Sequence, residues 1–255
     1  MIPIFIICIV AFLTSILTFF SGFGLGTILT PVFAIFFPVE IAISLTAIVH
    51  FLNNIFKLTL VGLPKEKEVI IKFGIPSLLF AFLGALLLTY LSSSLQTPVA
   101  FFNFTTNPVK IVIGSLILLF TLVEVVPFTK KIEFDKKYLF AGGALSGFFG
   151  GLSGNQGALR TLFLSKINLT KEAFISTGIV LACMVDVSRL IIYSEKYFSK
   201  TLPENIHLLI PATLSAFAGA FIGSRFLKKI TFPVIKTIIT CLLIVLSSLL
   251  ILGVI

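Results

Sequence analysis

The chain has 255 residues, of which 58% are hydrophobic and 11% are charged. A soluble domain carries roughly 25% charged residues, so this composition excludes a water-soluble globule and predicts an all-α polytopic protein in the lipid bilayer. The 19 Lys and Arg residues outnumber the 10 Asp and Glu residues and give a net charge of +9. We assign this surplus to cytoplasmic loops and expect no nucleic-acid partner.

Apolar stretches divide the chain into eight segments, separated by short charged or proline-containing loops. Six segments are near the length of one spanning helix, about 20 residues. The first and fifth are too long for one helix, and glycines interrupt each of them. The eight segments cover residues 1–37, 39–63, 69–91, 108–127, 138–166, 171–194, 205–227 and 232–254.

The break in the first segment lies within Ser21-Gly22-Phe23-Gly24-Leu25-Gly26. A turn at mid-membrane depth persists only where protein or a water-filled cavity satisfies its backbone. The helix that leaves this turn, from about Thr27, points its partly positive end at the midplane and favours an anion. The opposing helix brings its negative end to the same place, so which end faces the cavity stays open. We predict that Gly24, Gly26 and Thr27 bind substrate.

The second segment carries a polar stripe with spacings of four, three and four residues: Thr46, His50, Asn53 and Lys57. This stripe predicts a helix face turned toward the protein interior. His50 either carries a proton, donates to an oxyanion, or is a buried histidine bonded to a neighbouring helix. Lys57 is expected to extend to the cytoplasmic interface.

The break in the fifth segment runs from Gly150 to Gly157, and Arg160 follows it. A charged side chain within a membrane must face protein, water or ligand, so Arg160 either contacts an anion, extends to the cytoplasmic face, or pairs with Glu124 or Asp186. We predict substrate contacts from the turn and from this arginine: Gly154, Asn155, Gln156, Gly157 and Arg160.

Asp186 and Arg189 stand three residues apart on the sixth segment. They either neutralise each other along one helix face or line a path for substrate or protons. The titratable candidates for proton coupling are His50, Asp186 and Glu124.

The two halves of the chain resemble each other. Pro76–Leu87 aligns with Pro211–Ile222 at six of twelve positions without a gap. We predict a first transmembrane repeat (1–127), a basic cytoplasmic linker (128–137) and a second transmembrane repeat (138–255). Each repeat would contain one re-entrant, glycine-broken hairpin and three transmembrane helices.

Loop charge indicates how the repeats are oriented. If all eight segments cross, nine Lys and Arg residues lie on one side and five on the other. If the first and fifth segments are re-entrant hairpins, the division becomes twelve against two. The positive-inside rule favours the hairpins, hence an inverted repeat with both termini outside. Inverted repeats with broken helices are typical of transporters.

The cysteines lie in apolar stretches and lack the C-x-x-C spacing of a metal site. We expect neither a disulfide framework nor a metal site, and nothing in the sequence indicates a cofactor. These residues are Cys8, Cys183 and Cys241.

Two glycine-rich motifs, SGFGLGTILTPVF and LSGFFGGLSGNQGALRTLFL, resemble the signatures of the sulfite exporter TauE/SafE family. The resemblance runs across nearly the whole chain, although Leu25 stands where many relatives have glycine. It implies a prokaryotic plasma-membrane permease for small anions such as sulfur oxyanions or organosulfonates, in either direction. The matching positions are Gly24, Gly26, Pro31, Gly151, Gly154, Asn155, Gln156, Gly157 and Arg160.

Together these features predict a secondary transporter, not an enzyme, that moves a small anion by alternating access, with a proton or sodium as the coupling ion. A passive anion channel is the first alternative. The second is an intramembrane serine protease, because Gly151-Leu152-Ser153-Gly154 spells G-x-S-G. Its nucleophile would be Ser153, which would need His50 or His207 as its base.

Overall fold

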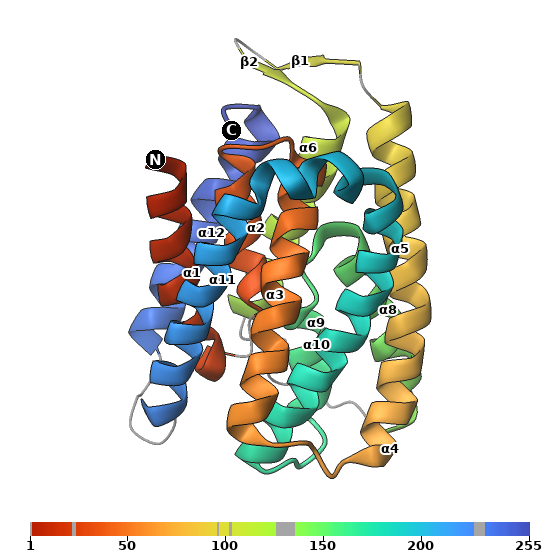
Figure 1. Cartoon of the computed structure of the whole chain (residues 1–255). Coiled ribbons are helices and arrows are strands. Elements are labelled where there is room, and N and C mark those ends of the chain that lie inside the picture. Colours follow the sequence, from red (N-terminus) through yellow and green to blue (C-terminus); the bar gives the residue numbers. More distant parts are fainter. Residues whose placement is uncertain (1, 22–23, 96, 102–103, 126–135, 227–232) are drawn as a thin grey trace.

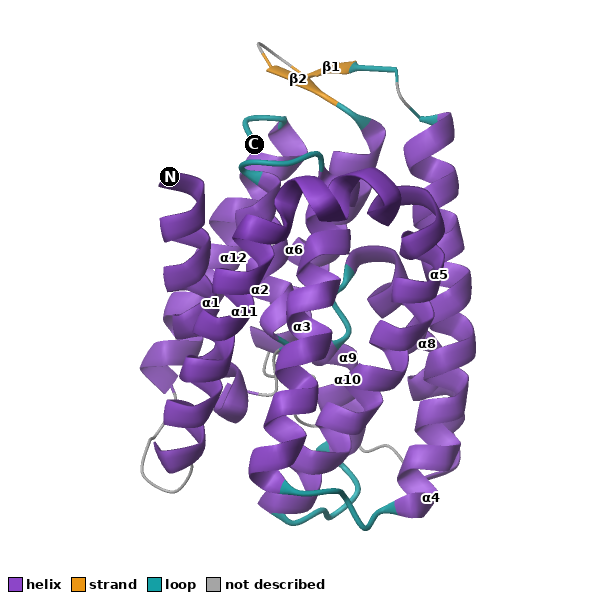
Figure 2. Ribbon diagram, in the orientation of Figure 1, coloured by secondary structure: helices purple, strands orange, loops and turns teal. Residues whose placement is uncertain are grey.

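The computed structural model describes residues 2–21, 24–95, 97–101, 104–125, 136–226 and 233–255, and helices dominate these ranges (Figures 1 and 2). The first half contains α1 (Ile2–Ser21), α2 (Leu25–Ala34), α3 (Val39–Val61), α4 (Lys67–Val69), the π-helix η1 (Ile70–Gly74), α5 (Ile75–Ser94), the antiparallel strands β1 (Val99–Phe101) and β2 (Phe104–Thr106), and α6 (Pro108–Val125). The second half contains the short helix η2 (Lys136–Tyr138), α8 (Leu139–Ser153), α9 (Gly157–Leu164), α10 (Lys171–Tyr193), the π-helix η3 (Ser194–Phe198), α11 (Ser199–Phe226) and α12 (Pro233–Leu252). Residues 126–135, which include most of the predicted linker (128–137), lie outside the described residues, so the boundaries of the two repeats stay a prediction.

Several helices are long and apolar enough to cross a bilayer, which makes the chain an all-α polytopic membrane protein. Within the described residues these are Ile2–Phe19, Val39–Val61, Lys67–Ser94, Lys171–Phe198 and Thr201–Arg225. Shorter apolar stretches lie in α2, α6 and α12. Unlike the sequence-based expectation, α1 alone has the length of a span, because its apolar run continues for 20 residues before the first glycine.

Both helices that were expected to be broken are broken at their glycines. In the first segment α1 ends at Ser21 and α2 begins at Leu25; residues 22–23 lie outside the described residues. In the fifth segment α8 ends at Ser153 and α9 begins at Gly157. In each case the second helix packs back against the first, and both chain ends lie at the same end of the bundle (Figure 1).

Each hairpin packs mainly against a helix of the other half of the chain: α8 against α5, and α1 against α11. Two glycines that align between the halves, Gly84 and Gly219, make this possible. A Cβ atom on Gly84 would lie 2.0 Å from the carbonyl oxygen of Phe148 on α8, and one on Gly219 would lie 2.2 Å from that of Phe12 on α1. Both contacts exclude any larger side chain. Small residues allow such close helix packing in membranes, so the aligned glycines have equivalent structural roles.

The short helix α2 lies inside the bundle and has no lipid-facing side. All ten of its residues are buried, and it packs against α1, α3 and α12. Its apolar side chains, including Leu29 and Phe33, belong to the main hydrophobic core. The core therefore holds the N-terminal end of α2, at Leu25, in the interior of the protein.

Candidate functional site

The tips of the two hairpins meet, although they are 128 residues apart in the chain. The Oγ1 atom of Thr27 donates a hydrogen bond of 3.0 Å to Oδ1 of Asn155. A Cβ atom on Gly26 would lie 3.3 Å from the carbonyl oxygen of Gly154. Because this side-chain hydrogen bond joins one hairpin to the other, the contact couples their positions.

Several buried polar atoms near this contact have no hydrogen-bond partner within the described structure. Buried polar groups are nearly always satisfied by protein, water or ligand, so such atoms indicate a place for water or a polar guest. They are Oγ1 of Thr30, Nδ2 of Asn155, and both Oε1 and Nε2 of Gln156.

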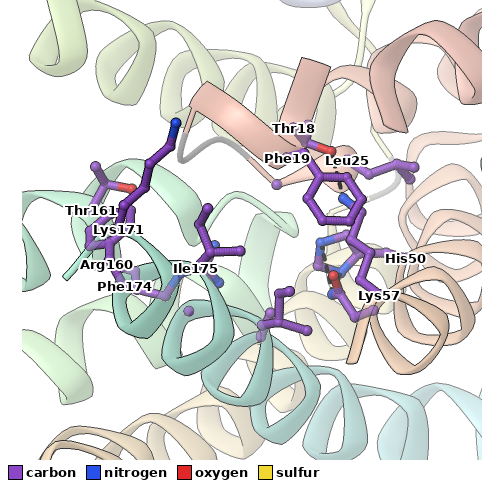
Figure 3. Close-up of a pocket in the computed structure, with 15 residues that line it drawn as sticks. Thr18, Phe19, Leu25, His50, Lys57, Arg160, Thr161, Lys171, Phe174 and Ile175 are labelled. Carbon is purple, nitrogen blue, oxygen red and sulfur yellow. Dashed lines mark hydrogen bonds between the residues drawn. The ribbon is translucent and has the colours of Figure 1, made fainter. Parts of the chain in front are cut away.

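Beside the hairpin tips lies a cavity of about 90 Å³, which we call the central cavity (Figure 3). By this measure a cavity of about 10–15 Å³ holds one water molecule, so the space is large enough for a small ion. The walls come from the end of α1 and start of α2, from α3, from α9 and from α10. The lining residues are Thr18, Phe19, Gly24, Leu25, His50, Asn54, Lys57, Arg160, Thr161, Lys171, Phe174, Ile175, Gly178, Ile179 and Ala182.

Two buried cations face the central cavity from opposite sides, Lys57 from α3 and Arg160 from α9 (Figure 3). Lys57 is 4% exposed and Arg160 is 7% exposed. Nζ of Lys57 donates to the neutral Oγ1 of Thr18 at 2.8 Å and lies 4.9 Å from the centre of the Phe19 ring. The expectation that Lys57 extends to the interface is wrong, because partners on α1 hold its ammonium group inside.

Arg160 lies against α10, where a Cβ atom on Gly178 would be 3.6 Å from its Nε atom. Its Nη1 atom has no hydrogen-bond partner in the described residues. Of the two acids considered as its partners, Asp186 pairs with other residues, and the side chain of Glu124 lies outside the described residues. The central cavity thus contains two buried cations and no lining carboxylate.

Behind the cavity wall, a charged cluster joins α3 to α10. Nδ1 of His50 lies 2.6 Å from Oδ2 of Asp186, and both side chains are buried. The other carboxylate oxygen of Asp186 accepts from Nε of Arg189 at 2.9 Å and lies 2.7 Å from its Nη2. The intrahelical pair of Asp186 and Arg189 therefore exists, and His50 from the other half of the chain joins it.

The predicted site residues fall into two neighbouring groups. Gly24, His50 and Arg160 line the central cavity. The others line the contact between the hairpin tips or follow it directly: Gly26, Thr27, Gly154, Asn155, Gln156 and Gly157. Lys57 and Lys171 also line the cavity, although neither was predicted to bind substrate. The polar stripe on α3 places Lys57 on the same helix face as His50, whereas no pattern in the sequence distinguishes Lys171 from other loop lysines.

Ser153 takes a structural part at the end of α8. Its Oγ atom donates to the carbonyl oxygen of Phe149 at 2.9 Å and accepts from the backbone N–H of Asn155 at 3.3 Å. Among the described hydrogen bonds, neither histidine of the chain contacts it. This arrangement stabilises the turn and lacks the paired base that a serine nucleophile needs.

The fold and the cavity together define a polytopic membrane transport protein. The family model described as sulfite exporter TauE/SafE matches residues 7–250. The chain belongs to the TauE/SafE family, which is a family of membrane transporters. Comparison with curated proteins gives no match, and neither does comparison with solved structures.

Proposed function

We propose that the protein is a secondary transporter for a small anion, with the central cavity as the binding site. The observation that carries the proposal is the pair of buried cations, Lys57 and Arg160, at one cavity without a lining carboxylate. An uncompensated buried charge is strongly unfavourable. An anion in the cavity would neutralise both groups and would supply an acceptor for the unpartnered Nη1 atom of Arg160.

The proposed substrate is a sulfur oxyanion, such as sulfite or thiosulfate, or a small organosulfonate. Membership of the TauE/SafE family supports this class. The chemistry of the cavity agrees, because guanidinium and ammonium groups bind oxyanions through charge-assisted hydrogen bonds. The volume of about 90 Å³ is sufficient for a compact anion.

The proposed mechanism is alternating access by an inverted repeat. Three features support it: both chain ends lie at one end of the bundle (Figure 1), the two hairpins meet through Thr27 and Asn155, and each hairpin packs on the other half of the chain. In such folds one half rocks against the other around a central site. Because each hairpin belongs to one half of the chain and packs on the other, the hairpin tips would move together with the two halves.

The proposed orientation places both termini outside, in the plasma membrane of a prokaryote. The central cavity would then reach the cytoplasmic end of the bundle, because one of its lining residues, Lys171, is exposed there. The neighbouring Thr170 shares a surface groove with Glu66 and Glu68, from the loop side of α4. This end of the bundle is the one to which loop charge assigns the cytoplasm.

Uptake into proteoliposomes tests the proposal. The panel contains sulfite, sulfate, thiosulfate, two sulfonates and small carboxylates, each measured for its own uptake and as competitor for radiolabelled thiosulfate. A transporter predicts uptake that saturates, is inhibited by the sulfur oxyanions, and is absent from empty vesicles. Conductance that rises linearly with concentration would favour the channel instead, and no flux of any panel anion would overturn the proposal.

Terminal tags test the orientation separately. Both tags should be accessible to protease from outside in intact cells. Tags on opposite faces would contradict the inverted arrangement while leaving the anion site intact.

A further inference from the structure

His50 is the one residue that belongs both to the central cavity and to the charged cluster behind it. Its ring lines the cavity, while Nδ1 contacts Asp186 at 2.6 Å. Asp186 is in turn held by Arg189 through its other oxygen. Because the carboxylate orients the ring, Nδ1 carries a proton that it donates to Asp186, and the protonation state can change only at Nε2.

The Nε2 atom of His50 is directed toward the first hairpin. A Cβ atom on Gly24 would lie 3.1 Å from it, and Gly24 itself lines the central cavity. The side-chain nitrogen of Asn54, one turn further along α3, lies 3.3 Å from both ring nitrogens. It can donate to Nε2 only while that atom is unprotonated, so protonation requires the amide to turn away. A proton on Nε2 therefore sits at the cavity wall, where it meets the bound anion.

The surrounding charges determine whether Nε2 of His50 binds a proton when the cavity is empty and when it holds an anion. Asp186 contacts the His50 ring directly at 2.6 Å and favours its protonation, which Arg189 beside Asp186 offsets only in part. The other charges that face the cavity are Lys57 from α3, Arg160 from α9 and Lys171 at the start of α10. Of the other helices near α3, α1, α2 and α5 contain no Asp, Glu, Lys, Arg or His. On α11, Glu204, His207 and Arg225 are exposed, and on α6 Lys110 lies in the first turn; none of these residues lines the cavity. With the cavity empty, these cations oppose protonation of His50. With an anion bound they are neutralised, and protonation becomes favourable.

Resting on the proposed anion site, we infer that His50 is the proton-coupling residue: one proton binds at Nε2 together with the anion, and the two cross the membrane together. Binding is reciprocal, because an anion that raises proton affinity is itself bound more tightly when the proton is present. Asp186 acts as a positioning residue that keeps Nε2 toward the cavity. The proton enters from water on one side and leaves from Nε2 to water on the other.

Two transport measurements with radiolabelled thiosulfate separate coupling from transport. Counterflow at equal pH on both sides reports anion exchange without net proton movement. Uptake driven by an inside-alkaline pH gradient reports coupling, which should accelerate wild-type entry by about tenfold per pH unit at most, since proton concentration changes by that factor. One proton together with the thiosulfate dianion carries net negative charge inward, so the membrane potential is clamped with potassium and valinomycin.

The His50→Gln variant keeps an amide that can donate to Asp186 but cannot titrate. Because His50 lines the binding cavity, we expect weaker thiosulfate binding, seen as a raised half-saturation concentration in counterflow, and complete loss of acceleration by the gradient at saturating thiosulfate. The matched control is His207→Gln, because His207 on α11 is exposed and lies outside the cavity. It should keep both activities.

Each outcome decides the inference. Wild-type counterflow without any response to the gradient overturns the coupling and leaves the anion transporter standing, whereas absence of counterflow in the wild type overturns the proposed function itself. A gradient response that persists in His50→Gln removes His50 as the proton site. If that variant does not fold, proton uptake by the wild type decides: addition of thiosulfate in weakly buffered detergent should remove up to about one proton per chain, and no uptake refutes the inference.

Discussion

The two hairpins have the same backbone plan and different side chains. In the first hairpin, α2 has only two polar side chains, Thr27 and Thr30, and no charge. In the second, the turn contains Asn155 and Gln156, and α9 contains Arg160. Both tips are buried and lie in contact. The first hairpin therefore contributes mainly backbone and packing, and the second contributes the polar and charged groups.

The same difference is visible at matching positions. Seven residues after the serine that precedes each glycine turn, Ser21 or Ser153, the first hairpin has Ile28 and the second has Arg160. Ile28 is buried in the hydrophobic core, whereas Arg160 lines the central cavity. The two hairpins thus share a break at glycines and differ in the side chains that follow it, which makes the site asymmetric.

The largest effect should follow from removing the charge of the second hairpin. Arg160→Gln keeps a hydrogen-bond donor but loses the guanidinium that faces the anion, so thiosulfate uptake should fall by at least about tenfold, as expected for a charged hydrogen bond. The control Arg225→Gln removes an exposed arginine at the end of α11 and should change uptake by less than about twofold. Equal effects of the two variants would remove Arg160 from the site.

The next effect concerns the backbone of the two turns. Gly154 ends α8 with φ of +75°, and a Cβ atom there would lie 2.8 Å from Nη1 of Arg189. Gly154→Ala should cost about 1–3 kcal/mol from strain alone, which lowers the thermal midpoint in detergent by roughly 2–12 °C for a chain of this size. Gly26→Ala lies within a helix and meets only a moderate contact at 3.3 Å, so its change should stay within about 1 kcal/mol. A larger loss for Gly26→Ala would reverse the comparison.

Local features of the site were predictable because they depend on neighbouring residues in the chain. Two segments are too long for one helix and contain runs of glycine, and these runs predicted where both helices break. The spacing of polar residues along α3 predicted a buried face. His50 and Lys57 are indeed both buried. These signals require no knowledge of which helices touch.

Contacts between distant segments were not predictable, because helical periodicity says which face is buried but not against what. The bond between Thr27 and Asn155, and the contact between His50 and Asp186, each join helices from opposite halves of the chain. The inward position of Lys57 depends likewise on partners in α1. The repeat suggested that the two glycine turns are equivalent, but only the fold brings them together.

A smaller effect should come from the bond between the tips. Thr27→Val removes the hydroxyl while keeping the shape, and it leaves Oδ1 of Asn155 without its donor. A net loss of about 0.5–1.5 kcal/mol is expected, seen as a lower thermal midpoint and a reduced uptake rate. Thr121→Val is the control, since Thr121 is also buried but donates to Ile117 within its own helix. If Thr27→Val and Thr121→Val behave alike, the bond between the hairpins has no special role in transport.

The smallest effect is expected at Ser153, which precedes the second turn. Its hydroxyl bonds to the backbone of its own hairpin. The bond to Phe149 adds to a turn of α8 that backbone hydrogen bonds already hold. Ser153→Ala should therefore reduce uptake by no more than about threefold, the value of one neutral hydrogen bond. Complete loss of function, together with peptide cleavage by the wild type that Ser153→Ala abolishes, would support the protease alternative. Ser153 and Arg160 are only seven residues apart. If Ser153→Ala reduces uptake slightly and Arg160→Gln reduces it strongly, then the second hairpin binds the anion through Arg160 on α9 and not through the Ser153 hydroxyl in the turn.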